Sequence, residues 1–221
     1  MIGNINNILF DLDGTLTDPK QGIVNSILYA LEKMGIQENY ISELGSFIGP
    51  PLHDSFAKRY NLTAEHTDMA VGYYREYFSE KGIFENKIYD GINELLASLS
   101  FMNYQLFVAT SKPTVYATKI LEHFKLNCYF KAVVGSHPDN TRTSKTEIIS
   151  HIVSAFGLQA SKSAMIGDRK YDIVGAKNNS VNAIGVTFGY GSLEELIASN
   201  PDYIVNNISE IGSLFSQKSN N

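Results

Sequence analysis

The segment from Ile8 to Asp18 places the strongest constraint on how this chain can fold. It begins with a short apolar run, continues with two acids one residue apart, Asp11 and Asp13, and turns at Gly14. A short apolar run that ends at a turn signal predicts a buried strand. Because an isolated carboxylate is too costly to bury in a core, we expect the two acids to lie at the carboxyl end of this strand.

The spacing of Asp11 and Asp13 favours a shared cleft. Residues two apart point to the same side of an extended chain. Two converging carboxylates need a cation or a shared proton between them. A strand that simply ends in a polar turn would also explain the sequence at Asp13, because Asp-Gly is an ordinary turn dipeptide. The segments that follow favour the cleft.

Length and composition predict a soluble globular protein that binds neither membranes nor nucleic acids. The chain has 221 residues, of which 43% are apolar and 19% charged, and this suits a sizeable core. No apolar run is long enough to span a membrane, and a net charge of -5 argues against affinity for nucleic acids. With no visible signal peptide and with Cys128 as the only cysteine, we expect a cytoplasmic protein, either a monomer or a homodimer.

The order of the predicted elements indicates an α/β fold, with a Rossmann-like parallel sheet as its core. Helical periodicity dominates the region from Pro19 to Phe84, where we find no convincing strand. Further along, short apolar strands alternate with helices, as is typical of a parallel sheet covered on both faces. The strands are predicted at residues 105–110, 132–135, 163–166, 182–187 and 203–205. We expect residues 1–16 and 85–221 to form the core, and residues 17–84 to form an inserted helical cap.

Two lysines are candidates for a positive charge at the site. In an open parallel sheet, ligands bind beyond the carboxyl ends of the strands. Thr110, Ser111 and Lys112 follow one such strand and precede a predicted helix, where hydroxyl and N–H groups suit an anion, although such residues are also ordinary helix caps. Lys145 begins the next predicted helix, where the helix dipole disfavours a cation. The sequence does not choose between Lys112 and Lys145.

A second pair of acids follows the predicted strand at residues 163–166. Asp168 comes directly after Gly167, and Asp172 lies four residues further on. In an open parallel sheet, the loops that follow the strands lie at one edge, where ligands bind. The sequence therefore predicts that Asp168 meets the first pair of acids at one edge of the sheet.

Taken together, these segments resemble the motifs of the haloacid dehalogenase-like hydrolases, most of which transfer phosphoryl groups. The resemblance covers nearly the whole chain and rests on four motifs in family order. They are Asp-Leu-Asp-Gly-Thr at residues 11–15, Thr110, Lys145, and Gly-Asp-x-x-x-Asp at residues 167–172. The chain is most similar to the subgroup with a helical cap after the first motif. Residues 17–19, 110–113 and 188–191 look like those of the phosphoglycolate phosphatase and 5′-nucleotidase branch.

This resemblance implies an aspartyl-phosphate mechanism with a magnesium ion. Asp11 would be the nucleophile, and Asp13 would act first as acid and then as base. Lys145 would neutralise the nucleophile and the phosphoryl oxygens. The metal would be held by the Asp11 carboxylate, the Asp13 backbone carbonyl and Asp168, while Asp172 would lie behind the metal or hold Lys145. The groups expected to bind the phosphoryl group or substrate are Thr110, Ser111, Lys112 and the turn at Gly14.

The resemblance implies a phosphatase for a small phosphorylated metabolite, such as phosphoglycolate or a nucleoside 5′-monophosphate. A phosphomutase or other phosphotransferase of the same superfamily would use the same two acids but would pass the phosphoryl group to a hydroxyl instead of water. A 2-haloacid dehalogenase shares the nucleophile but has no second acid of this kind, so Asp13 argues against it.

Overall fold

The chain forms two compact units in the computed structural model, which describes residues 2–137 and 142–215. One unit consists of residues 1–17 and 88–221, and the other of residues 18–87. The boundaries expected from the sequence, after residues 16 and 84, lie close to these. The chain passes between the units at two very short strands, β2 (Thr17–Asp18) and β3 (Lys87–Ile88), which pair with each other.

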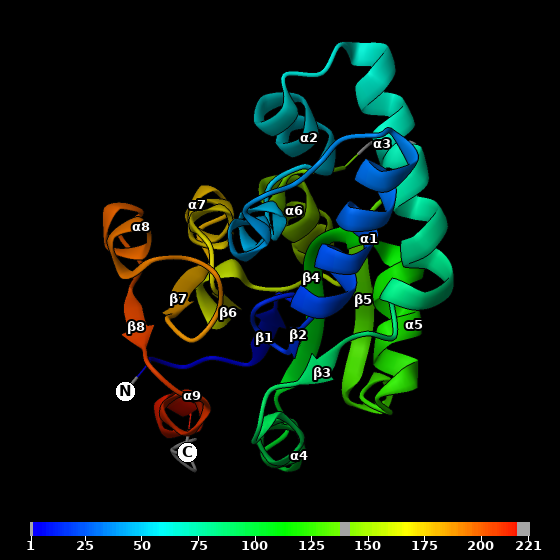
Figure 1. Ribbon diagram of the computed structural model, residues 1–221. Coiled ribbons are helices and arrows are strands. Elements are labelled where there is room, and N and C mark those ends of the chain that lie inside the picture. The colour runs from blue at the N-terminus through cyan, green and yellow to red at the C-terminus, as the bar shows by residue number, and fades with distance from the viewer. Residues whose placement is uncertain (1, 138–141, 216–221) are drawn as a thin grey trace. The chain divides into compact units, whose positions relative to one another are not determined.

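The larger unit contains a six-stranded sheet in which all neighbouring strands run parallel, so the predicted α/β fold is confirmed (Figure 1). The sheet has the order β5-β4-β1-β6-β7-β8. Its strands are β1 (Asn7–Phe10), β4 (Gln105–Pro113), β5 (Phe130–Ser136), β6 (Ser163–Gly167), β7 (Asn182–Val186) and β8 (Tyr203–Val205). All four residues of β1 are buried, because this strand lies between β4 and β6 and is covered on both faces.

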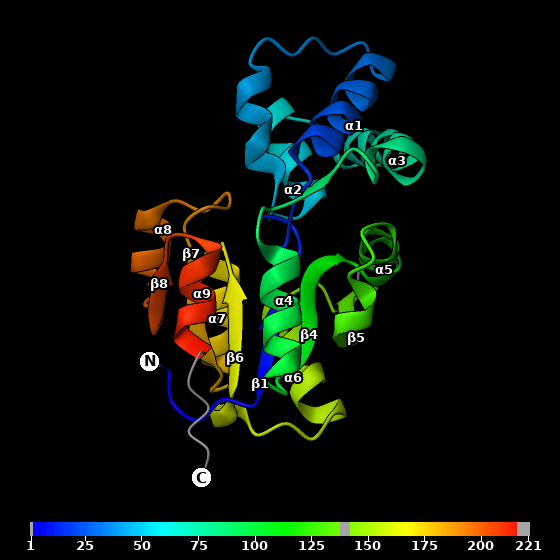
Figure 2. The same ribbon diagram turned by 90° about the horizontal axis from the view of Figure 1, so that it is seen from below.

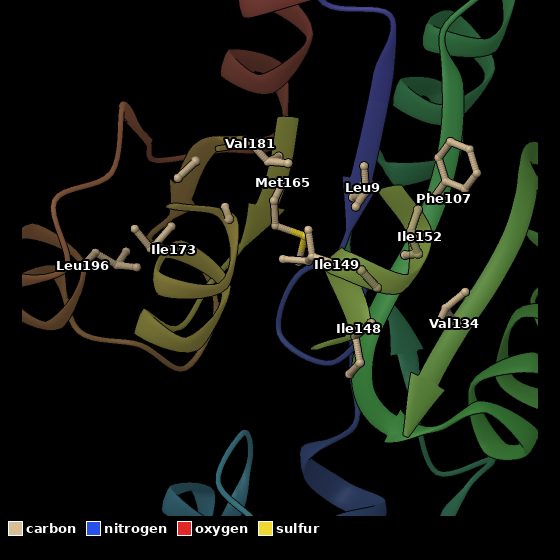
Figure 3. Packing of buried hydrophobic residues seen from close by; sticks show 13 residues of the cluster. Leu9, Phe107, Val134, Ile148, Ile149, Ile152, Met165, Ile173, Val181 and Leu196 are labelled. Carbon is tan, nitrogen blue, oxygen red and sulfur yellow. The ribbon is translucent and has the colours of Figure 1, made fainter. Parts of the chain in front are cut away.

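One face of the sheet is packed against three helices. They are α6 (Lys145–Ala155), α7 (Lys170–Asn178) and α8 (Leu193–Ala198). Leu9, Phe107 and Met165 come from three adjacent strands and belong to the same buried cluster as Ile149 and Ile152 of α6 (Figure 3). Each of these side chains is fully buried, and burying a side chain of this size contributes roughly 1.5–3 kcal/mol. This packing holds the carboxyl ends of β1, β4 and β6 together.

The opposite face carries α4 (Ile92–Phe101) and α9 (Ile208–Phe215), which contact each other (Figure 2). The Tyr104 hydroxyl donates a hydrogen bond of 3.0 Å to the Phe215 carbonyl, and the two rings meet edge to face. The remaining long helix of this unit, α5 (Thr114–His123), packs on β4 and β5. Within the described part of the chain, the helices lack the combination of length and apolarity that crossing a membrane would require.

The strand β4 is longer than the sequence predicted. It was expected to end at Thr110 but continues to Pro113, where α5 follows directly. Ala109 pairs with Val134 of β5, and Pro113 pairs with Ser136, so four steps along β4 match two steps along β5. The extra residues form a bulge, which is a common way to re-aim side chains next to a site.

The smaller unit is helical, with α1 (Lys20–Lys33), α2 (Leu52–Tyr60) and α3 (Ala64–Tyr77) as its main helices. A 3₁₀ segment, η1 (Ile41–Phe47), precedes α2, and a π-helical turn, η2 (Phe78–Gly82), follows α3. Phe47, Phe56 and Tyr74 form an aromatic cluster with ring centroids 5.2–6.4 Å apart in successive pairs. All three rings are buried and form part of the core of this unit.

A charged cluster fastens the segment before η1 to α2. The Glu38 carboxylate, whose side chain is 4% exposed, accepts hydrogen bonds from Arg59 Nε at 2.9 Å and from the Tyr60 hydroxyl. The hydrogen bond from Arg59 is the main cause that lowers the pKa of Glu38 to about 2. The folded protein therefore stabilises the ionised form of Glu38 relative to its protonated form.

This cluster predicts a pH-dependent contribution to stability. A carboxyl group whose pKa is lowered on folding stabilises the protein above its unfolded pKa, about 4.3, and loses this effect as the pH falls toward its folded pKa. We expect Glu38→Gln to lower the free energy of unfolding by roughly 1–2 kcal/mol at pH 7, and by less at pH 3. Urea unfolding at both pH values measures the difference. Glu80→Gln, at an exposed position of η2, is the control and should change little at either pH.

Candidate active site

The predicted site residues come together at the carboxyl edge of the sheet. Asp11 and Asp168 directly follow β1 and β6, and Thr110 is the last buried residue of β4; these three strands are adjacent and parallel. The Asp11 N–H donates to the Ile166 carbonyl at 2.9 Å, which continues the strand pairing one residue past β1. Asp11 is therefore held by the sheet itself and has little freedom in its backbone.

A tight turn follows Asp11 and directs the chain away from the sheet. The Leu12 carbonyl accepts hydrogen bonds from the N–H groups of Thr15, Leu16 and Thr17. Gly14, at φ +86°, adopts a left-handed conformation that side chains disfavour, and its N–H donates to Thr17. The turn predicted from the Asp-Gly dipeptide thus lies where the sequence placed it.

Lys145 is the buried cation of the site. Its side chain is 4% exposed, and its ammonium lies 2.7 Å from Oδ1 of Asp11 and 2.6 Å from Oδ1 of Asp172. It also donates to the Ala109 carbonyl at 2.9 Å. Burial alone would lower the pKa of Lys145, but the two carboxylates raise it above its ordinary value. An ammonium has three donors, and this one has three acceptors around it.

Local sequence explains how a lysine can occupy the first turn of α6. Ser144 caps the helix by accepting the N–H of Glu147, whose carboxylate bonds back to Ser144, so the helix start is satisfied without the lysine. Gly175 of α7 lies so close that an added Cβ would come within 2.8 Å of Lys145 Cβ. The helix dipole is unfavourable for this cation, but the two carboxylates outweigh it.

Asp172 lies in the first turn of α7, which begins at Lys170. Its Oδ2 accepts the N–H of Arg169 at 3.0 Å, while its Oδ1 meets Lys145. Burial is the largest influence on its pKa, followed by the opposing effect of Lys145, and the net result is a value of about 6. Both oxygens of Asp172 are thus engaged by this chain.

Lys112 meets the second acid of the first motif. Its ammonium lies 2.5 Å from Oδ2 of Asp13, in a pair whose side chains are 8% and 16% exposed. Burial raises the pKa of Asp13, although Lys112 opposes the effect. The bulge in β4 explains the contact, because it takes Thr110, Ser111 and Lys112 out of the regular pairing with β5. The two candidate lysines therefore pair with different acids.

Oδ1 of Asp13 is buried, yet among residues 2–137 and 142–215 no group donates a hydrogen bond to it. The hydroxyls expected to bind the phosphoryl group belong to Thr110, which is buried, and Ser111, which is partly exposed. Thr110 Oγ1 accepts the N–H of Lys112 at 3.3 Å, and the Ser111 carbonyl accepts from Ser136. The sequence suggested that both residues lie at a helix start. They lie instead in the bulge of β4, because α5 begins only at Thr114.

Asp168 is fully buried, and within the part of the chain that the structure describes no lysine forms an ion pair with it. Burial raises its pKa to about 8, and the negative charges of Asp172 and Asp11 add to this. The Tyr190 N–H donates to Oδ2 at 2.7 Å, and the Thr15 hydroxyl lies 3.5 Å from Oδ1. A carboxyl group whose pKa is raised this far by burial and by neighbouring negative charges would be stabilised in its ionised form by a bound cation.

The residues present fit a divalent cation. Four carboxyl groups, those of Asp11, Asp13, Asp168 and Asp172, share the site with two ammonium groups, so the site is short of positive charge. One oxygen each of Asp11, Asp168 and Asp172 lie within 4.8 Å of one another. Hard oxygen donors in this number suit Mg²⁺. Because both oxygens of Asp172 already have partners, Asp11 and Asp168 are the better available ligands.

Sequence reasoning assigned Gly14 to a turn and to substrate binding, but it did not connect Gly14, Gly189 or Gly191 with Asp168. A Cβ at Gly14 or Gly189 would lie 2.3 Å from atoms of Asp168, and one at Gly191 would lie 2.0 Å from its backbone oxygen. The segment from Phe188 to Gly191 had indicated only a similarity to one branch of a family. Gly189 and Gly191 leave room for the Asp168 carboxylate. This role can be recognised only when the structure shows which residue lies next to them.

Comparisons with known proteins identify the family to which this chain belongs. Residues 8–186 match the family model described as haloacid dehalogenase-like hydrolase. A 5′-nucleotidase from Pseudomonas aeruginosa is 48% identical over 89% of this chain and 89% of its own length. A tyrosine-protein kinase, PtkA, from Mycobacterium tuberculosis is 35% identical over 83% of this chain and 62% of its own length.

Solved structures agree with the sequence relatives. The crystal structure of a predicted phosphatase from Clostridium acetobutylicum superposes with a TM-score of 0.91 and is 48% identical, covering 96% of this chain and 98% of that one. The family match spans most of the chain and includes every acid and both lysines of the site. The chain therefore belongs to the haloacid dehalogenase-like hydrolase family and is a phosphatase of that family.

Proposed function

We propose that this protein is a Mg²⁺-dependent phosphomonoesterase in which Asp11 takes up the phosphoryl group. The observation that carries this proposal is the unequal setting of the two acids of the first motif. Asp11 is fixed through Oδ1 by Lys145 and by the Leu12 N–H at 2.7 Å. Oδ2 of Asp13 forms an ion pair with Lys112, whereas Oδ1 is buried and receives no hydrogen bond from the described residues.

In the first step, Asp11 attacks phosphorus and the bond to the leaving oxygen breaks. Because Oδ1 is occupied, Oδ2 is the attacking oxygen in our proposal. Lys145 stays beside Asp11 and spreads the negative charge that builds up on the transferred group. Bound Mg²⁺, held by Asp11, Asp168 and the Asp13 backbone carbonyl, would offset the repulsion between a dianionic ester and the nucleophile.

Asp13 handles the proton in both steps. A raised pKa suits it to give a proton to the leaving oxygen, and its free oxygen Oδ1 is the atom we assign to this transfer. In the second step the resulting carboxylate takes a proton from water, which attacks phosphorus and releases Asp11 and inorganic phosphate. The proton lost in the first step is thereby recovered.

The bulge of β4 supplies the groups that bind the phosphoryl oxygens. We assign this binding to the hydroxyls of Thr110 and Ser111, to the ammonium of Lys112 and to the backbone of the turn at Gly14. Asp172 holds Lys145 in place rather than the metal, since its oxygens bond to Lys145 and to the Arg169 N–H. These assignments leave each charged residue of the site with a task.

The substrate we propose is a small phosphoester, such as a nucleoside 5′-monophosphate or phosphoglycolate. A relative named as a 5′-nucleotidase supports the first choice. Phosphoryl transfer to a hydroxyl is the second candidate function, because a relative named as a tyrosine-protein kinase is 35% identical to this chain. The two functions share the first step and differ in what accepts the phosphoryl group from Asp11.

A substrate screen separates these functions. We expect inorganic phosphate to be released from at least one member of a panel of nucleoside monophosphates and small phosphoesters, at a rate above that of Asp11→Asn. Malachite green detection of phosphate gives the readout. Turnover that requires an added hydroxyl acceptor, with no phosphate released in its absence, would identify a phosphotransferase instead.

Removal of the metal should abolish turnover. Because the site has four carboxyl groups and two ammonium groups, EDTA is expected to reduce phosphate release to background, and Mg²⁺ added in excess should restore it. Phosphate release before and after dialysis measures the effect. Full turnover in EDTA would contradict the metal assignment.

The two acids should differ in an active-site burst experiment. Asp11→Asn removes the nucleophile and should release no phenol from an aryl phosphate above background. Asp13→Asn keeps the nucleophile, and an aryl leaving group needs little protonation, so the first step should survive. Loss of a positioned acid or base costs roughly 10²–10⁴-fold, and this loss should fall on hydrolysis of the aspartyl-phosphate.

The expected signature of Asp13→Asn is a burst of phenol, about one per active site, followed by a slow phase. Stopped-flow absorbance records it. A burst from Asp11→Asn would be incompatible with the nucleophile assignment. Steady, unimpaired turnover by Asp13→Asn would be incompatible with the acid and base assignment.

A further inference from the structure

We infer that the loop between β7 and α8, residues 187–192, is a positioning element that fixes the Asp168 carboxylate for metal binding. This inference rests on the proposed function in one respect, because it takes Asp168 as a ligand of Mg²⁺. It adds residues of this loop and of α8 to the machinery of the site, although none of them would touch the substrate or the metal.

The backbone of the loop makes the closest hydrogen bond to Asp168. The Tyr190 N–H lies 2.7 Å from Oδ2, whereas the Thr15 hydroxyl approaches Oδ1 only to 3.5 Å. A carboxylate rotates about a single bond, and a short hydrogen bond to one oxygen fixes where the other points. Tyr190 therefore sets the orientation of Asp168 through its backbone.

Two glycines allow the loop to come this close. A Cβ at Gly189 would lie 2.3 Å from Asp168 Cβ and 2.4 Å from the Gly14 backbone oxygen. At Gly191 it would lie 2.0 Å from the Asp168 backbone oxygen. Neither glycine has a positive φ, so close approach, and not an unusual backbone conformation, is the reason for a glycine at both positions.

An ion pair clamps the loop from its far end. Glu195 of α8 accepts from Arg169 Nε at 2.9 Å and from Arg169 Nη2 at 3.3 Å. The same carboxylate accepts the Lys170 N–H at 2.9 Å. Arg169 directly follows Asp168 in sequence. Asp168 is therefore held in two ways: by the loop that leads into α8, through the Tyr190 N–H, and by α8 itself, through the ion pair of Glu195 with Arg169.

The clamp is more than an ordinary surface pair. The side chains of Arg169 and Glu195 are 15% and 21% exposed, and the pair has two hydrogen bonds in parallel, a geometry that is stronger than a single contact. Ser192 also caps α8 by accepting the Glu195 N–H at 3.1 Å, which fixes the backbone that carries the carboxylate. A group that hydrogen-bonds a metal ligand directly, as the Tyr190 N–H bonds to Asp168, typically changes metal affinity 10–100-fold when lost, and the clamp holds the loop that carries this group.

The test measures Mg²⁺ binding to the metal-free, full-length protein without substrate, by isothermal titration calorimetry. Glu195→Gln should weaken Mg²⁺ binding about tenfold. Lys177→Gln is the matched control: it breaks an ion pair of 2.6 Å between α7 and Asp202, which does not involve Asp168, and it should leave Mg²⁺ binding unchanged. The rise in Tm on adding Mg²⁺ should shrink in the first variant and stay the same in the second.

A second pair of variants tests the glycines. Gly189→Ala should weaken Mg²⁺ binding at least tenfold, because its Cβ must displace Asp168 or the turn at Gly14. Gly212→Ala in α9, whose Cβ would meet its nearest neighbour at 3.7 Å, is the control and should bind Mg²⁺ as the parent protein does. If Gly189→Ala does not fold, the comparison of Glu195→Gln with Lys177→Gln decides the question.

Asp168→Asn is measured in parallel to separate this inference from the proposed function. If it loses Mg²⁺ binding while Glu195→Gln and Gly189→Ala bind as the parent protein does, the positioning inference is overturned and the metal assignment stands. If Asp168→Asn binds Mg²⁺ unchanged, the metal assignment itself fails, and the inference fails with it. Weaker binding in Glu195→Gln, with an unchanged Lys177→Gln, supports both.

Discussion

The ammonium group of Lys145 is the interaction on which the rest of the site depends. It connects the end of β1 through Asp11, the start of the bulge in β4 through the Ala109 carbonyl, and the start of α7 through Asp172. Buried carboxylates of like charge repel one another, and an unpaired buried charge is strongly destabilising. One cation between two of them makes it possible to gather four acids where three parallel strands end. The sheet sets the positions of these groups, and the positive charge of Lys145 reduces the repulsion between the neighbouring carboxylates.

Much of this arrangement could be predicted from the sequence, because its causes are local. Burial of β1 follows from its apolar run, and the turn at Gly14 follows from the Asp-Gly dipeptide. The alternation of strands and helices along the chain predicted the parallel sheet. The choice between Lys112 and Lys145 could not be made in this way, because it depends on a bulge in β4 that changes the pairing with β5. Strands of two residues, such as β2 and β3, are too short to show any periodicity.

The close packing around the site was equally out of reach of the sequence. A glycine in a turn can be explained by its own backbone, as at Gly14 with its φ of +86°. Gly175 and Gly189 have no positive φ, so their own backbone does not require a glycine. A glycine is needed there because a Cβ would clash with Lys145 at the first position and with Asp168 at the second. The sequence thus shows which charged groups take part, whereas the geometry between them rests on small residues whose partners are distant along the chain.

The central position of β1 also affects how the chain can be made. β1 is synthesised first, yet its neighbours β4 and β6 follow much later, and the hydrogen bond from Asn7 to Ser163 spans 156 residues. The unit of residues 18–87 is continuous and can complete its own contacts while β1 still lacks both neighbours. Pairing over such distances is slow, and an apolar strand with open edges is prone to aggregate until it is covered. A ribosome-bound chain that ends before β6 would therefore expose one edge of its central strand, and this edge is covered only after residues 163–167 have been made.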